Sequence, residues 1–293
     1  MDYTESTTPS FSPMKPPMPE TDPRRPTGDP HTSLLALPGM TLNSTIMPTF
    51  AWDWLSVDFT QFQPGLPDAA IDMSVYRRAL ADRLAAEPLW QRRRRIVVAH
   101  SFGGMLALDW LSESARVGIR AADAIVLVAT TAGPMFDAVQ IRLGTIAGRE
   151  IRVPFKPLMP VWNRSSVTRI VKRLIARSPE TEGSVDFTQV SPPSDVAVDV
   201  AGWRNTHWRS MRAYRLAMRG WDRRADLARL ELPAVVLHGS EDTLFPISVA
   251  EDLARRLPRA TLRIVESAGH VLPLTHGDHV LAAVEDVLCR LDR

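Results

Sequence analysis

The chain has 293 residues, of which 45% are hydrophobic and 23% charged, proportions typical of a globular protein that buries a sizeable core. The formal net charge is only +2, and acidic residues are interspersed among the arginines, so composition does not indicate a nucleic-acid-binding protein. The single cysteine, Cys289, excludes an intramolecular disulfide and a cysteine-based metal cluster. We expect this cysteine to pack on the apolar side of a C-terminal helix.

The first 30 residues combine Pro, Ser, Thr and charged residues with very little apolar surface, which predicts a disordered tail. They contain no apolar h-region of a signal peptide, and no apolar run in the sequence reaches membrane-spanning length. We therefore expect a soluble, cytoplasmic protein without a membrane partner.

The first core strand is predicted at 33–37, and Pro38-Gly39-Met40 ends it. A second strand is predicted at 57–62, after a segment that contains Trp52 and Trp54. These two aromatic residues either wall a substrate pocket or pack against the sheet. Both interpretations remain open from the sequence.

Apolar residues recur at helical spacing over 71–84, with charged residues opposite them, which predicts an amphipathic helix on one face of the sheet. The four arginines at 92–95 directly precede the next strand. They would lie at the amino edge of a parallel sheet, whereas ligands bind outside its carboxyl edge. We expect a solvated turn there rather than an anion site.

A buried strand, 96–99, leads through His100 into Ser101, and the helix-like spacing of apolar residues resumes immediately afterwards. A serine at the tip of such a strand–turn–helix junction projects its hydroxyl at the start of the helix. Residues on either side of so tight a turn must be small, and Ala99 and Gly103 satisfy this requirement.

Another buried strand is predicted at 124–129, after which the alternation of strands and helices stops for nearly 100 residues. This stretch contains two amphipathic segments, at 167–175 and at 203–221. The second is rich in arginine and aromatic residues and includes Trp203 and Met211 as candidate substrate contacts. Its arginines either bind an anionic group, such as a carboxylate or a phosphopantetheine, or form a solvated helix face.

Two further strands, at 234–237 and 261–265, each end in a polar motif. The first is followed by His-Gly-Ser-Glu-Asp-Thr-Leu-Phe-Pro, which contains Asp242, and the second by Ser-Ala-Gly-His, which ends at His270. Carboxyl ends of parallel strands share one edge of a sheet, so these side chains can meet Ser101 although they are distant in sequence.

The serine turn, the His-Gly-x-x-Asp-x-x-x-Pro string and the small-Gly-His motif together resemble the α/β-hydrolase superfamily. The resemblance implies a mostly parallel, doubly wound α/β sheet, with Ser101 as nucleophile, Asp242 as acid and His270 as base. It also implies an oxyanion hole formed by the backbone N–H groups of Met40 and Phe102. Departures from the family pattern are Ala99 in place of glycine, a degenerate turn at 63–68 and absent initial strands.

The same resemblance implies that residues 31–133 and 222–293 form the hydrolase core and that 134–221 form an inserted helical cap. The implied reaction is cleavage of a small-molecule carboxylic ester or thioester through an acyl-enzyme, without a cofactor or metal. A carrier-protein- or CoA-linked acyl group is among the candidate substrates. A C–C hydrolase, a lactonase, a peptidase, a lyase or cyclase using the same triad, and a non-catalytic binding module are the alternatives.

Overall fold

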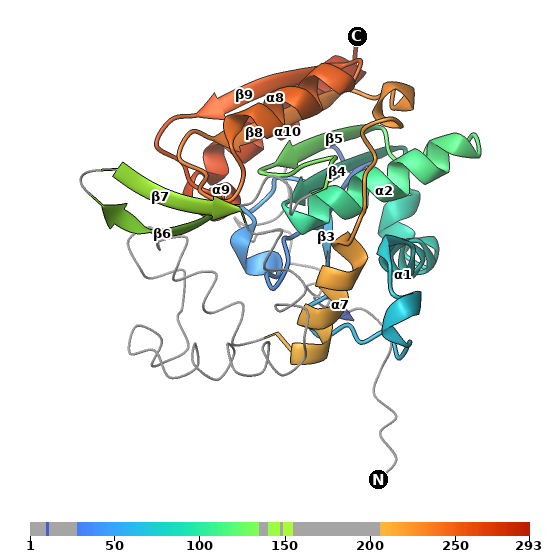
Figure 1. Cartoon of the computed structure of the whole chain (residues 1–293). Coiled ribbons are helices and arrows are strands. Elements are labelled where there is room, and N and C mark those ends of the chain that lie inside the picture. The colour runs from blue at the N-terminus through green and yellow to red at the C-terminus, as the bar shows by residue number, and fades with distance from the viewer. Residues whose placement is uncertain (1–9, 12–27, 135–139, 147–148, 155–205) are drawn as a thin grey trace.

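The computed structural model describes residues 10–11, 28–134, 140–146, 149–154 and 206–293. Its main sheet has seven strands in the order β1-β3-β2-β4-β5-β8-β9, and all except β1 run parallel (Figure 1). The parallel strands are β2 (Thr32–Leu37), β3 (Asp53–Asp58), β4 (Arg94–His100), β5 (Ala124–Val128), β8 (Ala234–Gly239) and β9 (Ala260–Val265). The α/β class predicted from the sequence is confirmed.

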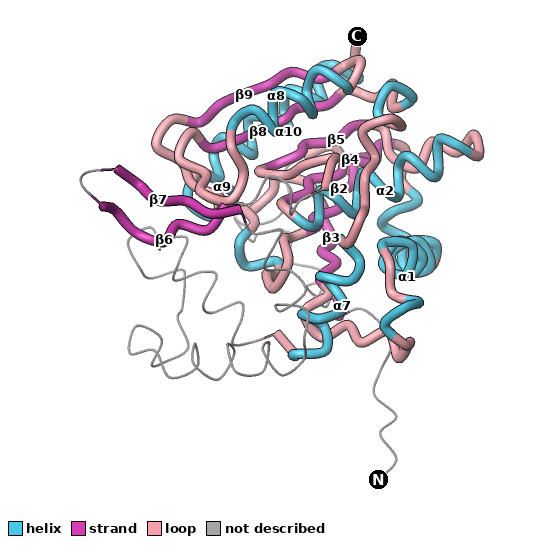
Figure 2. Tube along the Cα trace, in the orientation of Figure 1, coloured by secondary structure: helices cyan, strands magenta, loops and turns pink. Residues whose placement is uncertain are grey.

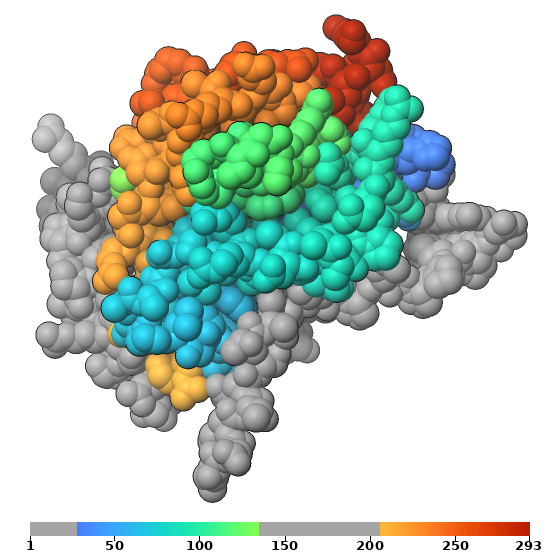
Figure 3. Space-filling model, turned by 90° about the vertical axis from the view of Figure 1, so that its right-hand side faces the viewer, coloured from blue at the N-terminus to red at the C-terminus, as the bar shows by residue number. Residues whose placement is uncertain are grey.

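Buried residues alternate between the two faces of the sheet with the period of a β-strand. One face packs against α1 (Met73–Ala85), α2 (Phe102–Arg116) and α8 (Ile247–Arg256). The other face packs against α10 (Gly277–Leu291), and the short helix α9 (Leu272–Thr275) immediately precedes α10. Figure 2 shows the strands between these helices, and Figure 3 shows α1 and α2 adjoining on the outer surface. Within the described residues, no helix combines the length and apolar composition needed to cross a membrane.

The direction in which the chain adds strands to the sheet reverses at β2. The chain goes from β2 to β3 on one side, and then crosses to β4 on the other side of β2. Ligands of open α/β sheets bind outside the carboxyl ends of the strands at such a switch point. The residues that follow β2 and β4 are Pro38-Gly39-Met40 and Ser101. Topology alone therefore puts these two segments next to each other at the expected binding edge.

Three local predictions need correction. The second core strand is β3, at 53–58 rather than 57–62, because Phe59 and Phe62 leave the strand and pack against Tyr76. Residues Ser10–Phe11, which fall within the predicted tail, form the antiparallel strand β1 beside β3. Cys289 is exposed, since the inward face of α10 is formed by Val280, Ala283, Val284, Val287 and Leu288.

The segment predicted as a helical cap contains an antiparallel hairpin in its described part. Strands β6 (Gln140–Ile146) and β7 (Arg149–Pro154) pair with each other, which the sequence reasoning did not predict. A helix, α7 (Trp208–Met218), lies within the predicted amphipathic stretch 203–221. The segment 155–205, with the other predicted amphipathic stretch, lies outside the described residues.

The arginine run at 92–95 lies at the start of β4, as predicted, at the edge opposite Ser101. Arg92 pairs with Asp53 at 2.7 Å, and Arg95 pairs with Asp123 at 3.3 Å. Carboxylates of the protein itself therefore neutralise part of this run, which agrees with a structural role for it.

A buried carboxylate joins helix α2 to the segment that leads from α7 back to β8. Asp109 is 1% exposed and accepts hydrogen bonds from Arg77 at 2.6 Å, from Trp221 at 2.9 Å and from Arg223 at 2.7 Å. The backbone N–H of Arg223 also donates to the carbonyl of Ala132. This hydrogen bond connects the beginning and the end of the long segment between β5 and β8.

Replacing Asp109 by asparagine is expected to lower the free energy of unfolding by about 3–5 kcal/mol, because it leaves two guanidinium groups without their buried counter-charge. Urea denaturation followed by tryptophan fluorescence measures this loss. Asp252→Asn is the matched control, since Asp252 pairs with Arg255 and Arg256 on the surface of α8. That change is expected to cost less than about 1 kcal/mol. Equal losses in the two variants would contradict the structural role of Asp109.

Candidate active site

Ser101 occupies a strained turn between β4 and α2. Its backbone has φ 51° and ψ −119°, a conformation that residues with a side chain rarely adopt. The turn is held by Ser101 N–H donating to the Val128 carbonyl at 3.0 Å and by the Thr130 hydroxyl donating to the Ser101 carbonyl at 2.7 Å. Strain of this kind persists only where surrounding contacts over-determine it, and it marks functional sites.

Gly103 explains why the turn tolerates only a small residue two positions after the serine. A β-carbon at this position would lie 2.1 Å from the carbonyl oxygen of Leu37 and 2.6 Å from that of Pro38. The first turn of α2 therefore lies directly against the carboxyl end of β2. The small-residue requirement predicted from the sequence is confirmed at this position.

The structure brings together the three polar residues that the sequence predicts as a group. His270 Nε2 lies 3.0 Å from Ser101 Oγ, and His270 Nδ1 lies 2.9 Å from Asp242 Oδ2. All three residues are at least 91% buried. A hydroxyl, an imidazole and a carboxylate thus form one continuous hydrogen-bonded line across the carboxyl edge of the sheet.

Asp242 is ionised because polar neighbours outweigh its burial. Burial by itself would raise the pKa of this carboxyl group, but the charge and hydrogen bond of His270 and the N–H of Phe245 lower it below its usual value. Its Oδ1 accepts from the N–H groups of Leu244 and Phe245 at 2.8 and 2.9 Å. The neighbouring Glu241 is exposed, so the carboxylate that faces His270 is the one that the sequence spacing predicts.

Two other histidines surround this line without belonging to it. His100 is fully buried, and its Nε2–H donates to the backbone carbonyl of His270 at 2.9 Å. His238 Nε2–H donates to the Phe245 carbonyl at 3.1 Å. Burial, with a smaller contribution from the charge of His270, lowers the pKa of His100 to about 3, so this ring is neutral at pH 7. Both contacts indicate structural roles for these two histidines.

The buried His100 predicts a loss of stability in acid. Above pH 6.5 the imidazole is neutral in both states, but between pH 6.5 and about 3 only the unfolded chain takes up the proton. The free energy of unfolding therefore falls with pH, by about 3 kcal/mol at pH 4.5 from this group alone. Urea titrations of wild type and His100→Asn at pH 7.5 and 4.5 measure the difference. A pH-induced loss of the same size in both proteins would contradict the prediction.

The turn after β2 lies against Ser101. A β-carbon on Gly39 would be 2.9 Å from His100 Nδ1 and 3.1 Å from Ser101 Cβ, so only glycine permits this approach. The backbone N–H groups of Met40 and Phe102 make no hydrogen bond to any part of the chain that the structure describes. For Phe102 this follows from its place as the first residue of α2, whose N–H has no partner within the helix.

The aromatic residues predicted at a substrate pocket lie at the start of β3 or just before it. Trp54 is the second residue of β3 and pairs in register with Leu34, near the amino ends of the strands, and Trp52 lies one residue before β3. Both pack against the core cluster on the α10 face, which supports the interpretation as packing residues, and their role as substrate contacts stays a prediction. Met211 is 1% exposed within α7, and its role as a substrate contact stays a prediction. Trp203 lies outside the described residues.

The arginines of α7 do not share one environment. Arg212 pairs with Asp68, with Nε 3.0 Å from the carboxylate, whereas Arg215 is only 3% exposed. Burial and the nearby charge of Arg212 lower the pKa of Arg215 to about 10. A uniformly solvated helix face, one of the two interpretations of this segment, therefore does not describe Arg215.

Thr130 is a site residue that sequence reasoning missed. Its hydroxyl holds the carbonyl of the strained Ser101, and its position two residues after the end of β5 is the signal that could have identified it. Among the described residues, no three His, Cys, Asp or Glu side chains are placed to bind a metal ion together.

Comparison with known proteins establishes the family. A sequence model of the alpha/beta hydrolase family matches residues 31–284. The chain belongs to this family. The matched range includes Ser101, Asp242 and His270, and it also includes the long segment between β5 and β8. The alpha/beta hydrolase family accounts for the sheet order and for the polar residues at its carboxyl edge.

A 67-residue stretch of this alpha/beta hydrolase, 23% of its length, is 39% identical to a pimeloyl-[acyl-carrier protein] methyl ester esterase of Aromatoleum aromaticum. That stretch covers only 27% of the esterase, about a quarter of this curated relative.

Among solved structures, MenH from S. aureus is similar over 98% of this chain and all of the other, with a TM-score of 0.63 and 14% identity. The esterase RhEst1 from Rhodococcus sp. is similar over 89% of this chain and 91% of the other, with a TM-score of 0.60 and 18% identity. At these identities the two structures show that the fold is shared.

Proposed function

We propose that this alpha/beta hydrolase is a serine hydrolase that cleaves a carboxylic ester or thioester of a small molecule. The observation that carries the proposal is the unbroken hydrogen-bonded line from Ser101 Oγ through His270 to the buried carboxylate of Asp242. A serine hydroxyl is a weak nucleophile near neutral pH unless a base lies within hydrogen-bond reach, and 3.0 Å is within that reach.

In the proposed reaction, Ser101 Oγ attacks the substrate carbonyl while His270 Nε2 takes the hydroxyl proton. The N–H groups of Met40 and Phe102 stabilise the negative charge on the tetrahedral intermediate. His270 then gives its proton to the departing alcohol or thiol, which leaves Ser101 acylated. A water molecule, deprotonated by His270, releases the carboxylic acid and restores the serine. Asp242 keeps the imidazole in the required tautomer throughout.

The proposed substrate class includes acyl groups attached to a carrier protein or to CoA. The partial similarity to a pimeloyl-[acyl-carrier protein] methyl ester esterase supports this class, since an ester of a carrier-bound acyl chain is the substrate in that protein's name. The matched stretch is short, so the proposal extends to the type of bond cleaved and to the attachment of the acyl group, and not to pimeloyl itself.

Hydrolysis is tested with short p-nitrophenyl esters and S-acyl-N-acetylcysteamine thioesters in water enriched in ¹⁸O. The proposal predicts one ¹⁸O atom in each released carboxylic acid, because water attacks the acyl-enzyme. Turnover of a candidate substrate without incorporation of ¹⁸O would favour a lyase or cyclase on the same residues. The absence of turnover, together with no reaction with a fluorophosphonate, would favour a binding module.

A further inference from the structure

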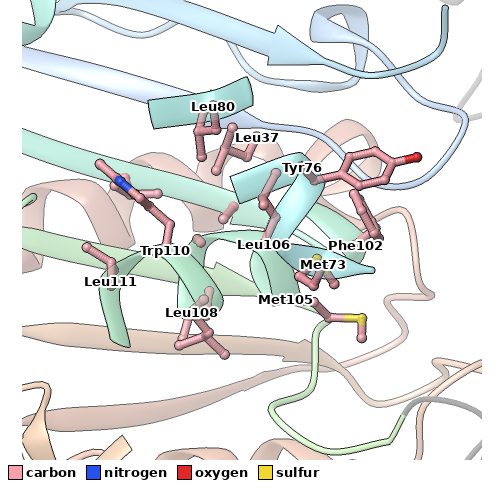
Figure 4. Packing of buried hydrophobic residues seen from close by; sticks show 14 of the residues in the cluster. Leu37, Met73, Tyr76, Leu80, Phe102, Met105, Leu106, Leu108, Trp110 and Leu111 are labelled. Carbon is pink, nitrogen blue, oxygen red and sulfur yellow. The ribbon is translucent and has the colours of Figure 1, made fainter. Parts of the chain in front are cut away.

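The two groups that must meet in the proposed reaction are anchored in different hydrophobic clusters. Figure 4 shows Phe102 and Met105 of α2, the helix that begins after Ser101, among the buried residues on one face of the sheet. Val271, directly after His270, belongs to the cluster on the opposite face. Packing within either cluster therefore does not by itself set the distance between the serine hydroxyl and the imidazole.

The proposed base lies in a turn rather than on a regular element. His270 falls between β9, which ends at Val265, and α9, which begins at Leu272. On the side of the acid, the Glu241 N–H donates to the Ala268 carbonyl at 2.9 Å and holds this turn. A loop owes its position to such tertiary contacts, because it lacks the hydrogen-bond ladder of a helix or strand.

His100 supplies the contact on the side of the nucleophile. Its Nε2–H donates to the His270 carbonyl at 2.9 Å, and the two imidazole rings lie 5.0 Å apart, centroid to centroid. His100 is fully buried and is the last residue of β4, so this bond joins a central strand to the turn that carries the base. A hydrogen bond in such a dry environment is electrostatically stronger than one in water.

The other ring nitrogen of His100 makes an imidazole costly at this position. Nδ1 is buried and has no hydrogen-bond partner within the described residues. It faces the turn after β2, where a β-carbon on Gly39 would lie 2.9 Å from it. Leaving a buried polar atom unsatisfied is unfavourable, and an apolar residue would avoid that cost. The bond from Nε2 to His270 is the interaction that accounts for an imidazole here.

We propose that His100 is a positioning residue for the base. Its Nε2–H holds the His270 backbone and thereby keeps the His270 imidazole within reach of Ser101 Oγ. His100 acts through His270 and takes no proton in the reaction. The inference rests on the proposed function, because the position of His270 matters only if this residue deprotonates Ser101.

His100→Met is expected to lower kcat about 10- to 100-fold and to leave KM within about twofold, because it displaces the base without changing substrate contacts. Methionine is close in length to the imidazole side chain but has no N–H to donate. The rate constant for phosphonylation of Ser101 by a fluorophosphonate is expected to fall by about the same factor, since His270 removes the same proton in that reaction.

Two amide substitutions separate the hydrogen bond from the change of side chain. Glutamine can place an N–H near the position of the imidazole Nε2–H, whereas asparagine is one methylene shorter and does not reach it. His100→Gln is expected to keep kcat within about threefold of the wild type, and His100→Asn is expected to lose as much activity as His100→Met. This pair gives a result even if His100→Met does not fold.

Asp109→Asn is the control for lost stability. Asp109 lies on α2, eight residues after Ser101, and the substitution is expected to destabilise the fold without touching the turn that carries His270. The extent of phosphonylation at the end point counts the competent sites, so kcat is expressed per labelled serine. By this measure Asp109→Asn is expected to keep wild-type kcat and KM. Melting temperatures of all variants report the loss of stability itself.

Wild-type kcat per labelled serine in both His100→Met and His100→Asn would overturn the positioning role and leave the proposed function intact. A loss in His100→Gln as large as that in His100→Met would also overturn it, since the donated hydrogen bond would then not be what the position requires. An equal loss in Asp109→Asn would reduce His100 to a residue that only stabilises the fold. A wild-type protein that neither hydrolyses esters nor reacts with the fluorophosphonate would refute the proposed function, and the positioning role with it.

Discussion

Replacing Ser101 by alanine is expected to lower kcat for ester hydrolysis by about 10⁶-fold, because the remaining His270 and Asp242 act as a unit with the missing hydroxyl. The alanine side chain fits the space of the serine and leaves the turn contacts of the backbone in place. The measurement is steady-state hydrolysis of a p-nitrophenyl ester by purified protein, with circular dichroism to verify folding.

Ser114→Ala is the matched control for this change. Ser114 lies on the same helix, thirteen residues further along, which separates it from Ser101 by about 20 Å. We expect this variant to keep wild-type kcat and KM. Substantial turnover by Ser101→Ala, above that of a buffer blank and a mock purification, is incompatible with a serine nucleophile at this position.

Replacing Asp242 by asparagine is expected to lower kcat by about 10⁴-fold, the loss typical of this change in Ser-His-Asp enzymes, because the amide favours the wrong imidazole tautomer. The folded state presents Asp242 as a carboxylate, since hydrogen bonds and the nearby imidazole lower its pKa despite burial. A pH–rate profile of the variant on the same ester separates loss of the base from loss of folding.

Glu241→Gln makes the same chemical change one residue earlier, on an exposed side chain whose backbone N–H bonds to the Ala268 carbonyl. It is expected to have kcat and KM close to those of the wild type. If Glu241→Gln were the damaging substitution and Asp242→Asn the neutral one, the acid would be wrongly assigned.

Local sequence signals were sufficient for the parts of the site that depend on one strand end. The strand–turn–helix pattern around Ser101 encodes the turn and the position of the hydroxyl, and Asp242 follows β8 at a spacing that points it inward. The parallel order of the strands then brings such ends to one edge. For these residues the chemistry and the fold are both readable from short segments.

Features that depend on packing between distant segments were not predictable in the same way. The aromatic residues Phe59 and Phe62 appear strand-like in sequence, but their contacts with Tyr76 on α1 remove them from β3. Asp109 resembles an ordinary polar residue on a helix, and only the fold places Arg77, Trp221 and Arg223 around it. The ring of Tyr214 likewise joins α7 to Phe102, at the start of α2.

Reaction with a fluorophosphonate, followed by peptide mass spectrometry, tests most directly whether the residue-101 hydroxyl is activated by its neighbours. Our account predicts a single phosphonyl adduct on the peptide that contains Ser101, formed rapidly in the wild type and at least about 10³-fold more slowly in His270→Ala. An adduct on another serine, or labelling of Ser101 at the same rate without the imidazole, would contradict it.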